Sequence, residues 1–334
     1  MSVLVLGLVV GGGFRASETP SPAGGEAYHD GMTWKDVERL RSEDRYAAAV
    51  EVVEKLLQRA IADKDADEWT RALVHLVQLR TALHGYETSV RLLQEREWPE
   101  STMHRAILEL FYAQGLVTYI RGYSWEIAQR ELVDTDGVID LKRWTQDQIF
   151  AEAQQAFRRV WQDRARWGER GLGTWAEYLD QNNYPARIRG TLRDALTYMW
   201  AQLLADSSLW RPRHANQVHR LDRESLIERG GSLAALDGLD DVDLHPLVKI
   251  AALLDDLEAW HLANERPEAA FEARLQKLQY LNASLEHEDD RAAIRLALRQ
   301  AVEDLGSRYP WWSMGQAVLA AMVQQEPSAD ALIR

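Results

Sequence analysis

Apolar residues recur every three or four positions along almost the whole chain from residue 33 onward. Within residues 44–65 this spacing runs through Tyr46, Val50, Val53, Leu56, Leu57 and Ile61. Residues 69–83 and 101–120 carry the same pattern. Such spacing places the apolar side chains on one side of an α-helix. No segment keeps up the alternation of apolar and polar residues that marks a half-buried strand. The sequence therefore predicts an all-α fold without a substantial sheet.

A weak internal repeat accompanies this periodicity. "DRYAAAVEVVEKLL" and "HGYETSVRLLQERE" align with Tyr46 over Tyr86 and Val50 over Val90, forty residues apart. "ERPEAAFEARLQKLQ", which starts at Glu265, begins in a related way. A turn, an aromatic residue or proline, and then small residues that open an amphipathic helix are typical of tetratricopeptide (TPR) hairpins. Because the full consensus of that repeat is absent, we predict a degenerate, TPR-like array of helical hairpins.

Changes in composition divide the chain into five predicted segments. Residues 1–16 resemble a signal peptide, and residues 17–32 form a flexible linker rich in Pro, Gly and Ser. Residues 33–210 form an N-terminal helical-repeat body, 211–246 a long polar loop, and 247–334 the C-terminal helical hairpins. The apolar run at the N-terminus has about ten residues, whereas a membrane-spanning helix needs roughly 20. We therefore expect no transmembrane span and an exported protein of the periplasm or cell envelope, although the basic residues that usually open a signal peptide are missing. The alternative is an apolar N-terminus that frays.

Bulk composition excludes several classes of function. The 334 residues carry a net charge of −13, which argues against nucleic acid or an anionic membrane as a partner. The chain has no cysteine, so disulfides, thiolate nucleophiles and thiolate metal sites are excluded. The 13 tryptophans are an unusual load of large side chains that must be buried or used as anchors.

The stretch "QNNYPARIRGTLRDALTYMW" at residues 181–200 concentrates basic residues in an acidic chain. Thr191, followed three residues later by Asp194, predicts a capping box that starts the next helix. The start of a helix explains the other residues of this stretch but not its arginines, Arg187, Arg189 and Arg193. They could bind carbonyl ends or carboxylates of a neighbouring helix, or an anionic ligand, and the structural role is favoured. Arg187 and Arg189 are also candidates for contact with a protein partner.

The other ionisable groups fit no reactive pattern. The acidic cluster formed by Asp237, Asp240, Asp241 and Asp243 lacks the regular spacing of a calcium-binding loop. A solvated acidic loop is the favoured interpretation. His214 and His219 are expected to lie in a loop, and the acidic residues 255, 256 and 258 on the solvent side of a helix. Phosphate-binding and nucleophile motifs are absent. We therefore expect no enzymatic activity, no cofactor and no metal.

Trp311 and Trp312 are adjacent in "RYPWWSMG", so on a helix they cannot both point inward. One of them is a candidate for a surface anchor, because protein interfaces favour tryptophan. The alternative is that this turn, which follows Pro310, closes the seam between the last hairpins.

Four segments, 108–134, 140–161, 182–204 and 248–281, follow one another in an order that resembles the N-terminal helical region of the large bacterial alpha-2-macroglobulin-like proteins. The third carries a "TLRD" motif that opens a helix, formed by Thr191, Leu192, Arg193 and Asp194. The fourth contains the pair Trp260–His261. The resemblance covers roughly residues 33–320, and its motifs are loose, so the order of the segments carries it.

This resemblance implies a component of the bacterial cell envelope. In that family β-sandwich domains, a bait region and often a thioester domain follow the helical region, and the proteins are thought to trap proteases. Without cysteine this chain cannot form a Cys–Gln thioester, so covalent trapping by the chain itself is excluded. We expect a non-enzymatic helical-repeat domain that supports protease inhibition by contact with macroglobulin-type β-sandwich domains of the same or an adjacent polypeptide. The alternatives are a structural spacer and a stand-alone TPR-like scaffold of the envelope.

Overall fold

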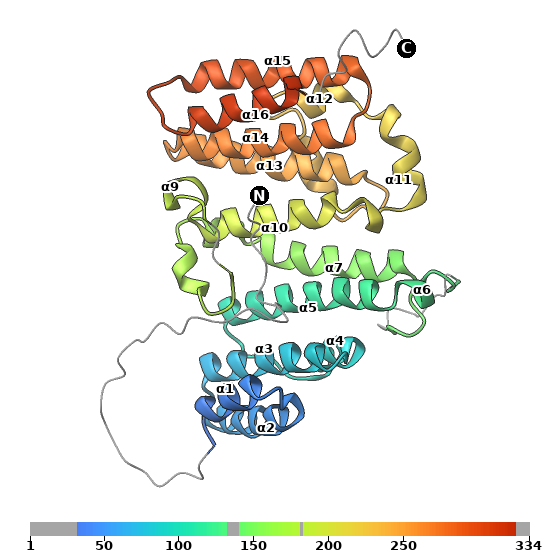
Figure 1. Cartoon of the computed structure of the whole chain (residues 1–334), viewed down its shortest axis with the longest axis vertical. Coiled ribbons are helices and arrows are strands. Elements are labelled where there is room, and N and C mark those ends of the chain that lie inside the picture. Colours follow the sequence, from blue (N-terminus) through green and yellow to red (C-terminus); the bar gives the residue numbers. More distant parts are fainter. Residues whose placement is uncertain (1–31, 132–139, 181–182, 325–334) are drawn as a thin grey trace. The chain divides into compact units, whose positions relative to one another are not determined.

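A computed structural model of the chain describes residues 32–131, 140–180 and 183–324 (Figure 1). The predicted all-α fold is confirmed for these residues, because they form helices joined by turns and no strand. An isolated antiparallel bridge pairs Gly171 with Thr191. The signal-peptide-like segment 1–16 and all but the last residue of the predicted linker lie outside the described residues, as do residues 325–334.

The described residues fall into two compact units. The N-terminal unit comprises residues 32–131, 140–160 and 177–180, and the C-terminal unit comprises 161–176 and 183–324. The sequence predicted the division of the chain within 211–246, but the structure places it near residue 160. The predicted polar loop lies inside the C-terminal unit and contains short helices. These helices are too short for apolar periodicity to show in the sequence. A few buried side chains, such as Leu226 and Leu239, attach them to the rest of the unit.

The helices of the N-terminal unit follow one another with short connections. They are α1 (Trp34–Ser42), α2 (Tyr46–Asp63), α3 (Ala66–Ala82), α4 (Tyr86–Glu95), α5 (Thr102–Gly122), α6 (Ser124–Ile127) and α7 (Gln146–Trp161, whose last residue belongs to the C-terminal unit). Each of α1 to α4 packs against the next helix in the chain, and α3 also contacts α5. The apolar stripe of α2 is buried as predicted at Val53, Leu56 and Leu57, whereas Ile61 is exposed.

The C-terminal unit begins with short helices and ends with long ones. They are α8 (Arg164–Trp167), η1 (Leu172–Trp175), α9 (Ala186–Arg189), α10 (Leu192–Ala205), η2 (Ser207–Leu209), α11 (Pro212–Gln217), η3 (Val218–Arg220), α12 (Arg223–Ile227), η4 (Leu233–Gly238), α13 (Pro246–Ala263), α14 (Pro267–Ser284), α15 (Glu288–Leu305) and α16 (Trp312–Gln324). The hairpin of α13 and α14 is central, since α10 and η4 pack on α13, α15 packs on α14, and α16 packs on α15. Figure 1 shows α13, α14, α15 and α16 running side by side.

The internal repeat seen in the sequence corresponds to one recurring turn. Asp44, Lys64, His84 and Glu265 are the non-glycine residues with positive φ among the described residues, with values of 54° to 59°. Each ends a helix, and the amide of the next residue donates to the carbonyl five residues earlier at 2.8 to 3.0 Å. This is the hydrogen bond that closes a Schellman turn. The three aligned sequence segments begin at Asp44, His84 and Glu265. Their similarity therefore reflects the same type of turn between two consecutive helices.

No helix in the described part of the chain combines the length and the apolar character needed to cross a bilayer.

Candidate functional site

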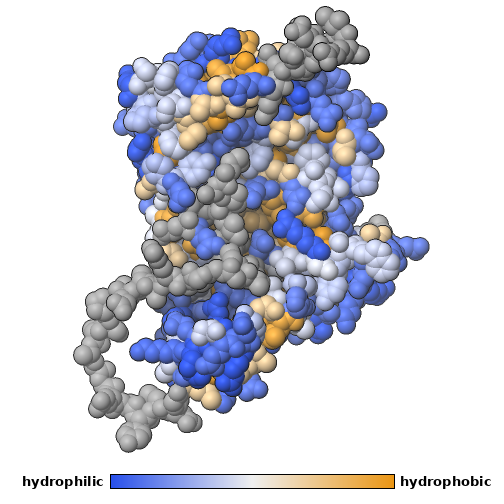
Figure 2. All heavy atoms as spheres, in the orientation of Figure 1, coloured by the Kyte–Doolittle hydropathy of each residue, from blue (hydrophilic) through white to orange (hydrophobic). Residues whose placement is uncertain are grey.

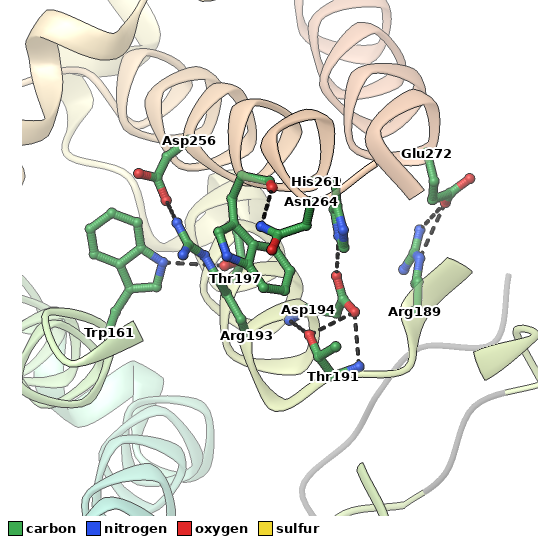
Figure 3. A network of polar contacts seen from close by, with 11 residues as sticks. Trp161, Arg189, Thr191, Arg193, Asp194, Thr197, Asp256, His261, Asn264 and Glu272 are labelled. Carbon is green, nitrogen blue, oxygen red and sulfur yellow. Dashed lines mark hydrogen bonds and ion pairs between the residues drawn. The ribbon is translucent and has the colours of Figure 1, made fainter. Parts of the chain in front are cut away.

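The N-terminus of α10 is the starting point of a buried polar network in the C-terminal unit (Figure 3). The predicted capping box is present: Asp194 Oδ2 accepts from Thr191 N at 2.9 Å, and Thr191 Oγ1 accepts from Asp194 N at 3.1 Å. The other carboxylate oxygen of Asp194 lies 2.7 Å from His261 Nε2 on α13. Both side chains are 1% exposed. The cap that starts α10 therefore also fastens it to α13.

The two motifs that carried the family resemblance meet at this point. Asp194 bonds His261, and the guanidinium of Arg193 lies 4.7 Å from the ring centroid of Trp260. Arg193 also bonds Asp256 at 2.7 Å. The "TLRD" and Trp–His segments are more than sixty residues apart in the sequence, yet they form one contact between two helices.

All three arginines of residues 181–200 that were singled out in the sequence bind carboxylates of neighbouring helices, as the favoured structural interpretation predicted. Arg187 Nε lies 3.0 Å from Glu268, Arg189 bonds Glu272 through two nitrogens, and Arg193 bonds Asp256. Arg189 and Arg193 are buried, whereas the side chain of Arg187 is 53% exposed. The region between α9 and the N-terminus of α10 is thus held to α13 and α14 by three ion pairs. Contact of Arg187 or Arg189 with a partner stays a prediction.

Aromatic rings cover the cations of this network. The guanidinium carbon of Arg189 lies 4.0 Å from the ring centroid of Tyr184 and 3.8 Å from that of Tyr198. The guanidinium of Arg164 lies 3.7 Å from the ring centroid of Trp161 and forms a two-pronged pair with Asp256 at 2.9 and 3.0 Å. Rings over the faces of a guanidinium leave its edge free for carboxylates. Part of the large aromatic content is therefore used to bury charge.

A second buried charge cluster lies where α13 and α14 meet the loop before η4. Lys277 Nζ bonds Asp255 and the carbonyl of Glu228, and the amide of Ser232 donates to Asp255 at 3.0 Å. Lys277 and Asp255 have fully buried side chains. Burial lowers the pKa of Lys277 against the opposing effect of Asp255.

Glu258 completes this cluster. Its carboxylate lies 2.7 Å from Arg229 and is 2% exposed. Burial raises the pKa of Glu258, while the positive charges of Arg229 and Arg274 act in the opposite direction. The sequence interpretation that placed Asp255, Asp256 and Glu258 on the solvent side of their helix is therefore wrong. The reason is that α13 is covered on several sides, by α10, α14 and η4, and has no wet face at these positions.

Trp311 extends the first network to the loop before α16. Its indole Nε1 donates to Glu272 at 2.7 Å, and its backbone amide donates to Glu268 at 2.9 Å. Trp312 packs against the apolar cluster of α14, α15 and α16. Both indoles are half-buried, which matches the interpretation of this turn as the closure of a seam. Whether a partner touches either one stays a prediction.

The histidines differ from expectation, whereas Asp237, Asp241 and Asp243 are exposed to solvent, as predicted. His214 is buried within α11, and His219 lies in the short helix η3, so neither lies in a plain loop. Asp243 pairs with Arg211 and Arg213. In the described part of the chain, no group of three His, Cys, Asp or Glu side chains is placed to hold a metal ion.

A cavity of about 260 Å³ lies elsewhere in the C-terminal unit, between η3 and the turn from α14 to α15. His219, Arg223, His287 and Asp290 line it, and Arg223 pairs with Asp290 at 3.0 Å.

The chemistry open to the buried network is limited by its burial. Five atoms in the two buried clusters have no hydrogen-bond partner: His261 Nδ1, Arg193 Nε, Tyr198 Oη, Glu258 Oε2 and Arg274 Nη1. None of these atoms reaches solvent, so none of them is presented to a ligand in solution. The arrangement is suited to fastening helices together.

Sequence reasoning missed one exposed aromatic residue. The side chain of Trp125 in α6 of the N-terminal unit is 76% exposed. Its polar neighbours Ser124 and Glu126 were the available sign of this exposure.

Comparisons with protein-family models, with curated proteins and with solved structures found no match to this chain.

Proposed function

We propose that the chain is a non-enzymatic helical scaffold that works by protein contact. The observation that supports this most is the use of Asp194 and His261. This Asp–His pair has the composition of a catalytic dyad, yet both groups are 1% exposed and the carboxylate is occupied by a helix cap. A general base needs access to a proton of its substrate. Here the pair serves to hold α10 against α13.

In this proposal the hairpins form a TPR-like array whose surface is its working part. The recurring turn at Asp44, Lys64, His84 and Glu265 supports such an array, since repeat proteins join similar hairpins by similar turns. The buried ion pairs support a C-terminal unit of fixed form, because breaking any one of them would leave a charge without solvent.

The family resemblance supplies the context of the proposal. We propose that the chain is exported to the cell envelope and acts as the helical module of an alpha-2-macroglobulin-like system, in support of protease trapping. Its partner would be a macroglobulin-type β-sandwich region in the same or an adjacent polypeptide. The "TLRD" segment contacts Trp260 and His261. This contact supports the resemblance because it gives the two motifs a shared structural role.

Binding of the purified full chain to the β-sandwich region encoded beside it tests this function. Titration calorimetry is expected to show a saturable complex, and the complex is expected to inhibit a protease more strongly than the β-sandwich region alone. The variant Trp125→Ser removes an exposed aromatic side chain and is expected to weaken binding without loss of helicity. Absence of binding, together with unchanged inhibition, would overturn the proposal.

A structural spacer is the second candidate, and the buried ion pairs favour it because they fix form without offering a reactive group. A spacer tolerates substitution of its exposed aromatic residues. Full function of Trp125→Ser, measured in cells as resistance to an added protease, would therefore favour the spacer over the docking module.

A further inference from the structure

The helix α16 carries no charged residue in a chain of which 27% is charged. Its inner side packs closely on the hairpin beneath it. A Cβ atom added to Gly315 would come within 2.4 Å of Phe271 on α14 and 2.7 Å of Val302 on α15. The position of α16 against the rest of the unit is therefore set by direct contact of its backbone.

The outer side of α16 is exposed and uncharged. It consists of Ser313, Met314, Gln316, Ala317, Ala320, Ala321, Val323 and Gln324, which we call the α16 outer face. Met314 and Val323 are 40% and 43% exposed, and Leu296 on the adjacent helix α15 is 64% exposed. Figure 2 shows orange and pale orange atoms over α15 and α16. Surface helices normally turn charged residues to solvent, and the end helices of repeat arrays do so as well. The composition of α16 is that of a helix with a neighbour on each side.

Three of the four residue pairs on the α16 outer face match in character when the helix is reversed, and the fourth, Gln316 with Ala321, does not. Reversal about the midpoint between residues 318 and 319 exchanges Met314 with Val323 and Ala317 with Ala320. A two-fold axis through this midpoint would set two copies of α16 antiparallel, with alanines at the centre and larger apolar side chains at the ends. Small central residues let helix axes approach closely, and a two-fold contact requires a surface that complements itself. We propose that a second copy of this chain covers the α16 outer face.

Charge favours a copy of the same helix over other surfaces. The chain has a net charge of −13, so a symmetric contact through most of its surface would bring like charges together. The α16 outer face meets its own copy without opposing any charges. Antiparallel helices also place the positive end of one helix dipole beside the negative end of the other.

The size of the face sets the strength of the contact. The α16 outer face belongs to one helix of 13 residues, which is about 20 Å long and about 10 Å wide. A patch of roughly 200 Å² is about a quarter of the ~800 Å² per partner of a standard interface. The dimer is therefore weak.

Sedimentation velocity of the full chain from low to high micromolar concentration tests the dimer. The mass is expected to rise from 38.2 kDa towards twice that value. Ala320→Glu is expected to keep the chain monomeric over the whole range. The matched control Ala47→Glu, at an exposed position of α2 in the N-terminal unit, is expected to leave the rise unchanged. A wild-type chain that stays monomeric would overturn the proposal and assign the face to residues 325–334 or to a helix of another protein.

Disulfide trapping tests the antiparallel register. The chain has no cysteine, so each introduced thiol is unique. A mixture of Ala317→Cys and Ala320→Cys is expected to form mainly the mixed disulfide dimer under mild oxidation, because these positions oppose each other. The control pair Ala47→Cys and Ala320→Cys is expected to remain monomeric. Equal yields in both mixtures, or predominance of the two homodimers in the first, would contradict the register.

Discussion

Asp194 on α10 and His261 on α13 form a hydrogen bond of 2.7 Å in which neither side chain reaches solvent. One carboxylate thereby completes a helix cap and holds the imidazole of another helix. Through this double use, Asp194 both starts α10 and joins it to α13.

Asp194→Ala is expected to lower the free energy of unfolding by about 2–4 kcal/mol, because it removes a cap and leaves a buried imidazole unpaired. Urea unfolding followed by circular dichroism measures the change. Asp67→Ala is the matched control: Asp67 bonds His104 at 2.9 Å, but its side chain is 88% exposed. The control is expected to cost less than about 1 kcal/mol. Equal losses in the two variants would show that burial of the Asp194–His261 pair contributes nothing.

Lys277→Met is expected to destabilise the chain by about 3–5 kcal/mol, since Asp255 would keep a buried negative charge without its cation. The double variant Lys277→Met/Asp255→Leu removes both charges and is expected to regain most of this loss. Both values come from chemical denaturation. A double variant as unstable as the single one would indicate that the cluster stabilises through packing alone.

Lys64→Gly is expected to stabilise the chain by up to about 1 kcal/mol, because Lys64 has φ of 54° and glycine adopts this conformation without strain. The control Lys55→Gly lies at an exposed position inside α2 and is expected to cost about 1 kcal/mol. Thermal melts of the two variants should therefore shift in opposite directions. A melting temperature lowered by both substitutions would refute the role of the left-handed turn.

His245 is expected to make the chain less stable in mild acid. Its Nδ1 accepts from the amide of Leu247 at the start of α13, and its Nε2 lies 3.0 Å from the carbonyl of His214. Burial lowers the pKa of His245 to about 4. The unfolded chain, in which histidine has a pKa of about 6.5, binds the proton more readily than the folded chain between these two values. The stabilising contribution is complete above about pH 6.5 and falls by roughly 3 kcal/mol as the pH approaches 4.

His245→Asn keeps an acceptor at the start of the helix and removes the titrating group. The difference in unfolding free energy between pH 7 and pH 4.5 is expected to be smaller in this variant than in the wild type. An identical pH dependence would show that other groups cause the acid sensitivity.

The fold class and the start of α10 could be predicted because their causes are local. Apolar spacing of three and four marks a helix within one segment, and Thr191 and Asp194 are only three residues apart. The arginines could be assigned to carboxylates because they remained after the cap was explained, but their partners could not be named. Those partners depend on how α9 and α10 pack on α13 and α14, which no local pattern records.

The burial of Asp255 and Glu258 was missed for a similar reason. Acidic residues on a helix usually face water, and only the surrounding elements show that α13 has no wet side here. A clue was nevertheless present in the hairpin predicted between α13 and α14. Asp255 and Lys277 are each 11 residues from Arg266 in the turn, and Glu258 and Arg274 are each 8 residues from it. Opposite charges at equal distances from a helical turn indicate that the two helices face each other at these positions.

The equal spacing of these charges also limits how α13 and α14 can respond to a partner. A shift of one helix along the other by a single residue would separate Lys277 from Asp255. Both charges would then be buried without a partner and without water. The hairpin therefore cannot adjust its register to suit whatever docks on the unit. A binding protein must match the outline that these helices already have, and selectivity for such a protein would come from the rigidity of the surface.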